Sequence, residues 1–132
     1  EFVPEWSNDK LIIAFDMHCP GLHEEKLFLY EMKQEVIEKE VNIFSNILES
    51  LLPYYSVKDN LPYGTAWNSD KTYSEGRPFR HWIAEEIPSI KLVSSVEIPY
   101  ASIKGYELNQ KTTKIIGHNF LNAIYNWITY KS

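Results

Sequence analysis

The sequence predicts an α/β domain built on a mixed, mostly parallel sheet that is flanked by helices. Two segments, 11–15 and 90–98, have the apolar and β-branched composition of strands. Two others, 34–52 and 112–130, repeat apolar residues every three or four positions, as amphipathic helices do. The strand-like and helical segments alternate along the chain, which is typical of this class.

The first strand is the run Leu11–Phe15, which has no polar alternation and is expected to be buried on both faces. It leads into Asp16-Met17-His18-Cys19, and Pro20-Gly21 then stops the strand. In open α/β sheets, ligands lie just beyond the carboxyl ends of strands. This strand therefore delivers an Asp-x-His pair to a position where a polar site is expected. Before it, residues 1–10 form a polar lead-in, with Trp6 expected to pack as an anchor.

The segment 26–32 is rich in aromatic and large apolar residues, and we interpret it as a second, short strand. The segment 34–52 is predicted to be a helix that ends at Pro53. Its apolar stripe consists of Val36, Ile37, Val41, Phe44, Ile47, Leu48 and Leu51.

A long connection, 54–76, contains many aromatic side chains: Tyr54, Tyr55, Tyr63, Trp67 and Tyr73. Long loops in compact domains are often binding or lid segments. Aromatic residues in such a loop more commonly cover the edges of a core. Both interpretations stay open, with about equal weight.

The remaining elements are two helices and one strand. A short helix is predicted over 77–87, with Pro78 in its first turn and Pro88 after its end. The strand 90–98 follows, and Thr112 or Thr113 is expected to cap a last helix that runs to Tyr130.

Composition limits the classes of function. The 132 residues suit one domain, and the formal net charge is -5 with no basic block, so the electrostatic footprint of a nucleic-acid-binding protein is absent from the sequence. No run approaches the roughly 18 to 20 apolar residues of a membrane helix. The single cysteine, Cys19, excludes an internal disulfide.

Each confident strand ends in a candidate site residue just before a proline: His18 after the first strand and Glu97 at the end of the second. If the strands are neighbours, the two side chains converge on one edge of the sheet. A neutral imidazole is a good Zn²⁺ ligand, and a nearby carboxylate can take a proton from metal-bound water. Asp16 could support His18 by accepting its other ring N–H. A structural role for His18, as a satisfied histidine after a strand, remains the commoner alternative.

Cys19 and the other three histidines are weaker candidates for a catalytic or metal-binding role. Cys19 is adjacent to His18 and would point to the opposite face of a strand, so a Cys-His nucleophile pair is disfavoured. We expect the Cys19 side chain to be buried as a small apolar group in the core. A catalytic zinc needs three protein ligands. None of His23, His81 and His118 begins a His-x-x-Glu motif. The sequence therefore does not display a complete catalytic metal site.

The two strand ends together resemble a known family. The segment Phe15-Asp16-Met17-His18-Cys19-Pro20 is similar to the Asp-x-His-x-Pro segment of bacterial zinc carboxypeptidase-like proteins of the carboxypeptidase A type. Ser95-Val96-Glu97-Ile98-Pro99-Tyr100-Ala101 resembles the strand that bears the family's catalytic glutamate. The order of elements, with about eighty residues between the motifs and a helix after the second, is also similar.

The resemblance implies roles for single residues. His18 matches the family's third zinc ligand, Glu97 its general base, and Tyr63 a mobile loop tyrosine that contacts the substrate. It covers only the C-terminal half of the family's catalytic domain, so the predicted sheet is half of the phosphorylase/hydrolase-like carboxypeptidase fold. The upstream His-x-x-Glu, which supplies two zinc ligands, and the substrate-binding Asn-Arg pair have no counterpart here.

The interpretation of the resemblance that we favour is that residues 1–132 are one domain, the C-terminal part of a larger zinc metallopeptidase. The alternative is a natural short relative of the family that has lost catalysis. The parent would cleave a C-terminal peptide or amide bond with metal-activated water, and this chain alone would be inactive. An N-acyl amino acid deacylase or amidase of the same fold is one alternative. The other is a non-enzymatic α/β binding module that uses the aromatic loop 54–73.

Expected partners are a peptide or small amide substrate and the missing N-terminal half of the domain, with no nucleic acid and no membrane. Self-association through an exposed sheet edge is also open. The family resemblance suggests a secreted or periplasmic protein, although no targeting segment is visible.

Overall fold

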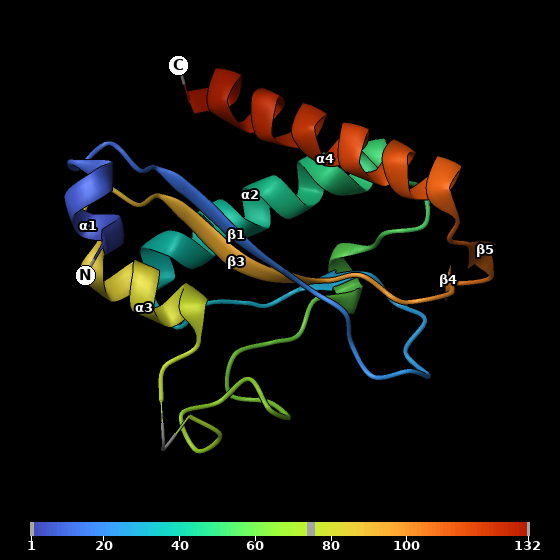
Figure 1. Cartoon of the computed structure of the whole chain (residues 1–132), viewed down its shortest axis with the longest axis horizontal. Coiled ribbons are helices and arrows are strands. Elements are labelled where there is room, and N and C mark those ends of the chain that lie inside the picture. The colour runs from blue at the N-terminus through green and yellow to red at the C-terminus, as the bar shows by residue number, and fades with distance from the viewer. Residues whose placement is uncertain (1, 74–75, 132) are drawn as a thin grey trace.

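The computed structural model describes residues 2–73 and 76–131, apart from the side chain of Phe2. Figure 1 shows the arrangement of its helices and strands. In chain order the elements are α1 (Phe2–Ser7), β1 (Ile13–His18), β2 (Phe28–Leu29), α2 (Glu35–Leu51), the 3₁₀ helix η1 (Val57–Asp59), α3 (Phe79–Glu86), β3 (Leu92–Glu97), β4 (Ser102–Ile103), β5 (Tyr106–Glu107) and α4 (Gln110–Lys131).

Three strands form the main sheet of the described residues, in the order β1-β3-β2. β1 and β3 are parallel, in a register that runs from Ile13↔Leu92 to His18↔Glu97. β2 is antiparallel to β3. The predicted α/β class is confirmed and the sheet is mixed. It has one parallel and one antiparallel pairing, however, and is not the mostly parallel sheet that the sequence predicts.

Strand β1 lies at an edge of this sheet, so the prediction that it is buried on both faces is wrong. Its side chains are half-buried up to Asp16, and Met17 and His18 are exposed. The strand also extends through His18, further than the predicted run. The physical reason is that, within the described residues, β3 is its only strand neighbour. An apolar run indicates a strand, but the number of its neighbours is set by the rest of the fold.

The predicted helices are confirmed, with small shifts at their ends. α2 lies one residue inside its predicted span at each end, and α3 begins directly after Pro78. α4 begins earlier than predicted because Asn109, not a threonine, caps it: the Asn109 Oδ1 accepts the N–H groups of Lys111 and Thr112. None of the described helices is both long and apolar enough to cross a membrane.

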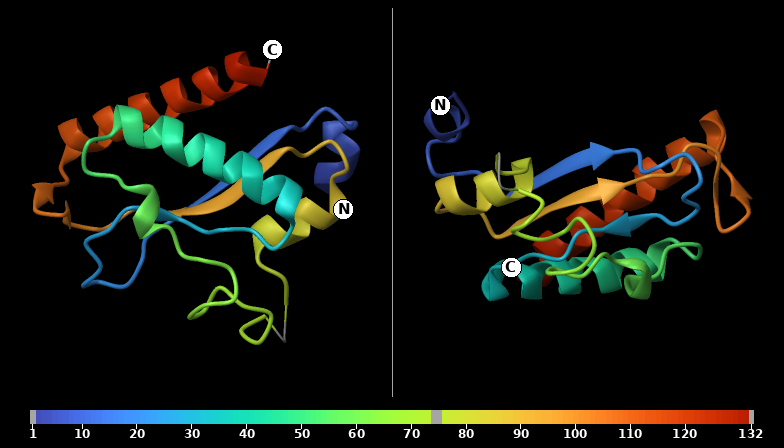
Figure 2. Two further views of the ribbon diagram at one scale, coloured as in Figure 1. Left: turned by 180° about the vertical axis from the view of Figure 1, so that it is seen from behind. Right: turned by 90° about the horizontal axis from the view of Figure 1, so that it is seen from below.

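The sheet has two chemically different faces. One face packs against α2 and α4, where the Phe15 ring lies 4.9 Å from the rings of both Phe44 and Phe120. Two views of the ribbon show α4 on one side of the strands and the loop 61–73 on the other (Figure 2). Successive side chains on a strand point to opposite faces, so one face of β1 and β3 serves the core and the other is left for polar residues.

Two further predictions about packing are wrong. Trp6 is 69% exposed on α1 and does not anchor the N-terminal segment. Cys19 is exposed, because it follows the last residue of β1 and lies beyond the part of the sheet that β3 covers.

Glu38 in the first turn of α2 is expected to make stability depend on pH. Burial, with a smaller contribution from Glu31, raises the Glu38 pKa from 4.5 to about 7. The unfolded chain therefore ionises at lower pH than the folded chain, and the stability that Glu38 contributes when protonated is lost as the pH rises through about 7. After a discount for the partial exposure of the side chain, the expected loss between pH 5 and pH 8 is about 1 kcal/mol.

Urea unfolding of the wild-type and Glu38→Gln proteins at both pH values measures this loss. Glu38→Gln should lack it, and Glu35→Gln, which changes an exposed residue of the same turn, should retain it. Parallel pH profiles for the wild-type and Glu38→Gln proteins would contradict the prediction.

Candidate functional site

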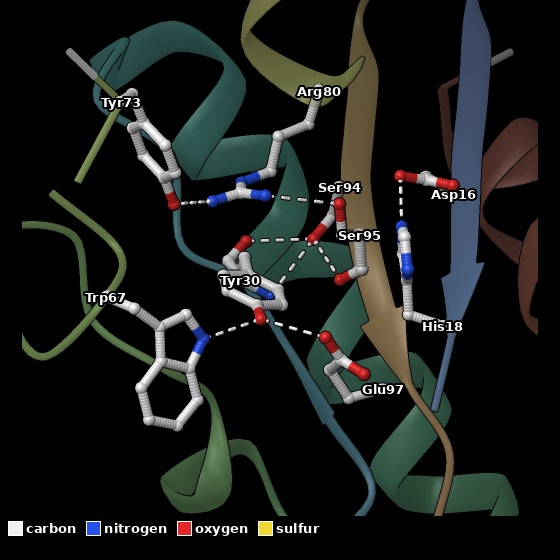
Figure 3. Close-up of polar contacts among 9 residues, drawn as sticks. All are labelled: Asp16, His18, Tyr30, Trp67, Tyr73, Arg80, Ser94, Ser95 and Glu97. Atoms are coloured by element: carbon white, nitrogen blue, oxygen red, sulfur yellow. Dashed lines mark hydrogen bonds and ion pairs between the residues drawn. The ribbon is translucent and has the colours of Figure 1, made fainter. Parts of the chain in front are cut away.

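Four polar side chains lie on the sheet face opposite α2 and α4. In the β1–β3 register, Asp16 is opposite Ser95 and His18 is opposite Glu97. Register partners on adjacent parallel strands point to the same face, and residues two apart on one strand do so as well. Figure 3 shows these residues side by side at the carboxyl ends of the two strands. The structure therefore brings together the two predicted strand ends.

Asp16 holds the His18 ring. The Asp16 Oδ2 lies 2.5 Å from the His18 Nε2, and the two side chains are 30% and 52% exposed. Among the described residues, the His18 Nδ1 has no hydrogen-bond partner. A histidine whose second ring nitrogen is held by a carboxylate is the usual arrangement of a metal ligand, because the contact fixes the ring's orientation and tautomer. The predicted supporting position of Asp16 matches this geometry.

Glu97 is buried and is held through one of its two oxygens. Tyr30 donates its hydroxyl to the Glu97 Oε1 at 2.8 Å, and the Trp67 indole Nε1 donates to that hydroxyl at 2.7 Å. Burial is the main reason that the Tyr30 pKa is raised to about 12, so the phenol stays protonated and remains a donor at neutral pH. The Glu97 Oε2 is buried and has no hydrogen-bond partner among the described residues.

Arg80, from the first turn of α3, is the cation of the site and is only 4% exposed. Its Nη1 donates to the Ser95 Oγ at 3.3 Å, and its Nη2 donates to the Asn68 Oδ1 at 2.9 Å and to the Tyr73 hydroxyl. Its Cζ lies 4.1 Å from the centre of the Tyr30 ring. The guanidinium therefore links α3 and the loop 61–73 to the polar face of the sheet.

These residues line one hollow of about 260 Å³. Its lining is Asp16, His18, Tyr30, Trp67, Tyr73, Pro78, Phe79, Arg80, Ser95 and Glu97. A neighbouring hollow of about 530 Å³, formed largely by residues 19–24, shares Tyr30, Trp67 and Glu97 with it. Together they offer the space of a small-molecule site, with acidic, basic and aromatic groups on its walls.

No protein-family model matches this chain. No curated protein and no solved structure matches it either. The geometry of its own residues is therefore what bears on function.

Tyr63 does not line the hollow that His18 and Glu97 share. Its ring lies 5.9 Å from the His81 ring and 6.0 Å from the Lys33 Nζ. Its contact with substrate stays a prediction. Of the same aromatic loop, Tyr55 is buried in the core, whereas Trp67 and Tyr73 line the hollow. The core-covering interpretation therefore holds for Tyr55, and a role of the loop in binding stays a prediction.

The residues that sequence reasoning missed are Arg80, Tyr30 and Ser95. A signal for Arg80 was present, because it lies three positions before the buried Ile83 of α3 and seven before the buried Ile87 that follows the helix. Ser95 precedes Glu97 by two positions, which places both on one face of the strand. Tyr30 gave no comparable signal, since its contact with Glu97 joins residues 67 positions apart.

No group of three or more His, Cys, Asp or Glu side chains with a metal-binding arrangement occurs in residues 2–73 and 76–131. A catalytic zinc site takes three protein ligands. The oriented imidazole of His18 fits one of these positions, and Glu97 fits a base beside it. Any further ligands would have to come from outside this set.

Proposed function

We propose that this chain supplies one zinc ligand, His18, and the proton-transferring carboxylate, Glu97, of a carboxypeptidase-like hydrolase that cleaves a C-terminal peptide or amide bond. The observation that supports this proposal is the register of β1 and β3. It places His18 opposite Glu97 at the carboxyl ends of adjacent parallel strands, on one face and in one hollow. A ligand and a base that act on the same water must be neighbours of this kind.

In this proposal the remaining ligands lie in polypeptide outside residues 1–132, and the sheet is half of a carboxypeptidase-type sheet. The free edge of β1 supports a continued sheet, because no described strand pairs with its outer side. Unpaired backbone groups on an edge strand are a template for a further strand.

The residues of this chain have separate tasks in the reaction. A bound zinc would polarise the scissile carbonyl and lower the pKa of a coordinated water. Asp16 keeps the His18 ring in one orientation. The Glu97 Oε2 accepts a proton from the attacking water and returns it to the leaving amine, while the Tyr30 hydroxyl holds the other Glu97 oxygen in place.

The test compares the 132-residue chain with the full polypeptide that its gene encodes. We expect the full polypeptide to bind zinc stoichiometrically and to release the C-terminal residue from N-acyl dipeptides. The 132-residue chain should show no turnover at any zinc concentration. Robust zinc-dependent hydrolysis by that chain alone would contradict the proposal, as would a full polypeptide that binds no zinc.

Substitutions of His18 and Asp16 test separately whether this chain contributes to zinc binding. In the full polypeptide, His18→Gln should abolish stoichiometric zinc binding. Asp16→Asn should weaken zinc affinity by about 10- to 100-fold, because it removes the group that orients the ligand. His118→Gln, which changes an exposed histidine on α4, is the matched control and should bind zinc as the wild type does. Metal content by atomic spectroscopy and competition with a chromogenic chelator measure both effects.

One observation favours a second candidate, a binding module. Trp67 is 51% exposed while it lines the hollow, and an exposed indole beside a polar site suits ligand stacking. If the full polypeptide binds a peptide without hydrolysing it and without zinc, this alternative replaces the hydrolase. A deacylase or amidase with the same residues would instead retain zinc dependence and prefer N-acyl amino acids to dipeptides.

A further inference from the structure

Within the described residues, the buried guanidinium of Arg80 donates hydrogen bonds to neutral groups only. Its hydrogen-bond acceptors are a serine hydroxyl, an asparagine carbonyl and a tyrosine hydroxyl. The faces of Tyr30 and Tyr73 lie 4.1 Å and 5.4 Å from its Cζ. Within the described residues, no carboxylate forms an ion pair with it. Arg77, three positions earlier, pairs with both Glu85 and Glu86.

A buried guanidinium such as that of Arg80 normally has a negatively charged partner. Burial of a cation costs free energy unless an anion or a full set of hydrogen bonds compensates, and buried charges in proteins are usually paired. Aromatic faces and neutral acceptors compensate only in part. The Arg80 Nε is also buried and has no acceptor among the described residues. Among the described residues, the Arg80 guanidinium therefore has no paired anion, although the hollow that it lines also contains the carboxylates of Asp16 and Glu97.

The hollow of about 260 Å³ is the space next to Arg80 in which an anionic partner would lie. Arg80 lines it together with Asp16, His18, Ser95 and Glu97. The guanidinium contacts Ser95, which lies two strand positions before Glu97, a separation of about 7 Å along a strand. A carboxylate at the end of a short side chain can span that length while its backbone lies beside Glu97.

We propose that Arg80 binds a ligand carboxylate, and that this hollow takes an acidic side chain, of the aspartyl or glutamyl type. The carboxylate accepts hydrogen bonds from the guanidinium in the planar geometry that suits this pair. Binding of the anion depends only on Arg80 and its surroundings. The further statement that the acidic residue flanks the cleaved bond rests on the proposed function of His18 and Glu97.

Two small probes of the same size and charge distinguish the possible sources of the carboxylate. N-acetyl-L-glutamic acid α-amide has only the side-chain carboxylate, and N-acetyl-L-glutamine has only the α-carboxylate. The neutral N-acetyl-L-glutamine amide is the control for shape. Each is titrated into the ¹⁵N-labelled 132-residue chain without metal, and the Arg80 Nε–H and Trp67 indole N–H resonances are followed.

We expect the α-amide of acetylglutamate to shift both resonances and to bind at least about tenfold more tightly than either other probe, because only it delivers a side-chain carboxylate to the guanidinium. Equal binding of all three probes, or no binding of the first, would overturn the proposal. Preference for N-acetyl-L-glutamine would overturn the side-chain assignment in favour of an α-carboxylate site.

Variants test whether Arg80 is the group responsible. Arg80→Met should abolish the preference for the anionic probe, whereas Arg77→Met should retain it, since Arg77 is exposed and does not line this hollow. If Arg80→Met fails to fold, the three-probe comparison on the wild-type protein still decides the proposal. The titration involves neither zinc nor turnover, so a full polypeptide that binds no zinc would leave the titration result unaffected. A titration without binding would overturn the acidic-ligand proposal and leave the hydrolase proposal standing.

Discussion

Replacing Glu97 with glutamine is expected to lower kcat of the zinc-loaded full polypeptide by about 10³-fold, within the range of about 10² to 10⁴ for the loss of a general acid–base group. Glutamine has nearly the same shape, and its amide oxygen can still accept the Tyr30 hydroxyl in the place of the Glu97 Oε1. It cannot take a proton from water. The expected loss is therefore in the chemical step, with zinc content and the free energy of unfolding close to those of the wild type.

Steady-state hydrolysis of an N-acyl dipeptide, together with zinc content and urea unfolding, measures these quantities. Glu107→Gln is the control, because Glu107 lies exposed on β5, away from the hollow. If Glu97→Gln retained more than about a tenth of the wild-type kcat, Glu97 would not be the base. If Glu97→Gln lost zinc together with activity, Glu97 would be needed to maintain the metal site, and the loss of activity would not identify it as the base.

The second large effect is expected in the core that supports β1. Phe44 on α2 is fully buried, and its ring lies 4.9 Å from the Phe15 ring and 5.2 Å from the Phe120 ring. Phe44→Ala removes the aromatic group at the junction of β1, α2 and α4. The lost transfer free energy and the remaining cavity should lower the free energy of unfolding by about 3 to 5 kcal/mol.

Urea unfolding of the 132-residue chain, followed by circular dichroism, measures this change. Val36→Ala on the same helix is the control, because Val36 is 75% exposed and its replacement should change stability by less than about 0.5 kcal/mol. A cost below about 1 kcal/mol for Phe44→Ala would mean that β1 and the two helices are not packed as the ring distances indicate.

The regular elements could be predicted because their signals are local. The apolar stripe of α2 and the β-branched residues of β3 are properties of short windows, and both elements occur close to their predicted bounds. The predicted cap of α4 was wrong by a few positions, since Asn109 and Thr112 are both good capping residues and only the backbone geometry distinguishes them. The exposure of Trp6 and Cys19 depends on what other segments cover, which no local window contains.

In the candidate site, too, some features follow from local sequence and others only from long-range contacts. Alternation along a strand is local, so the sequence by itself determined that Asp16 shares a face with His18, and that His18 and Glu97 each follow or end a strand. Only the tertiary structure decided that the two strands are parallel neighbours in a register that pairs His18 with Glu97. It also decided that Arg80, Tyr30 and Trp67 complete the hollow and that β1 is an edge strand. These facts depend on contacts between residues distant in the chain, whose free energies are set by the packing of the whole domain and by no single segment.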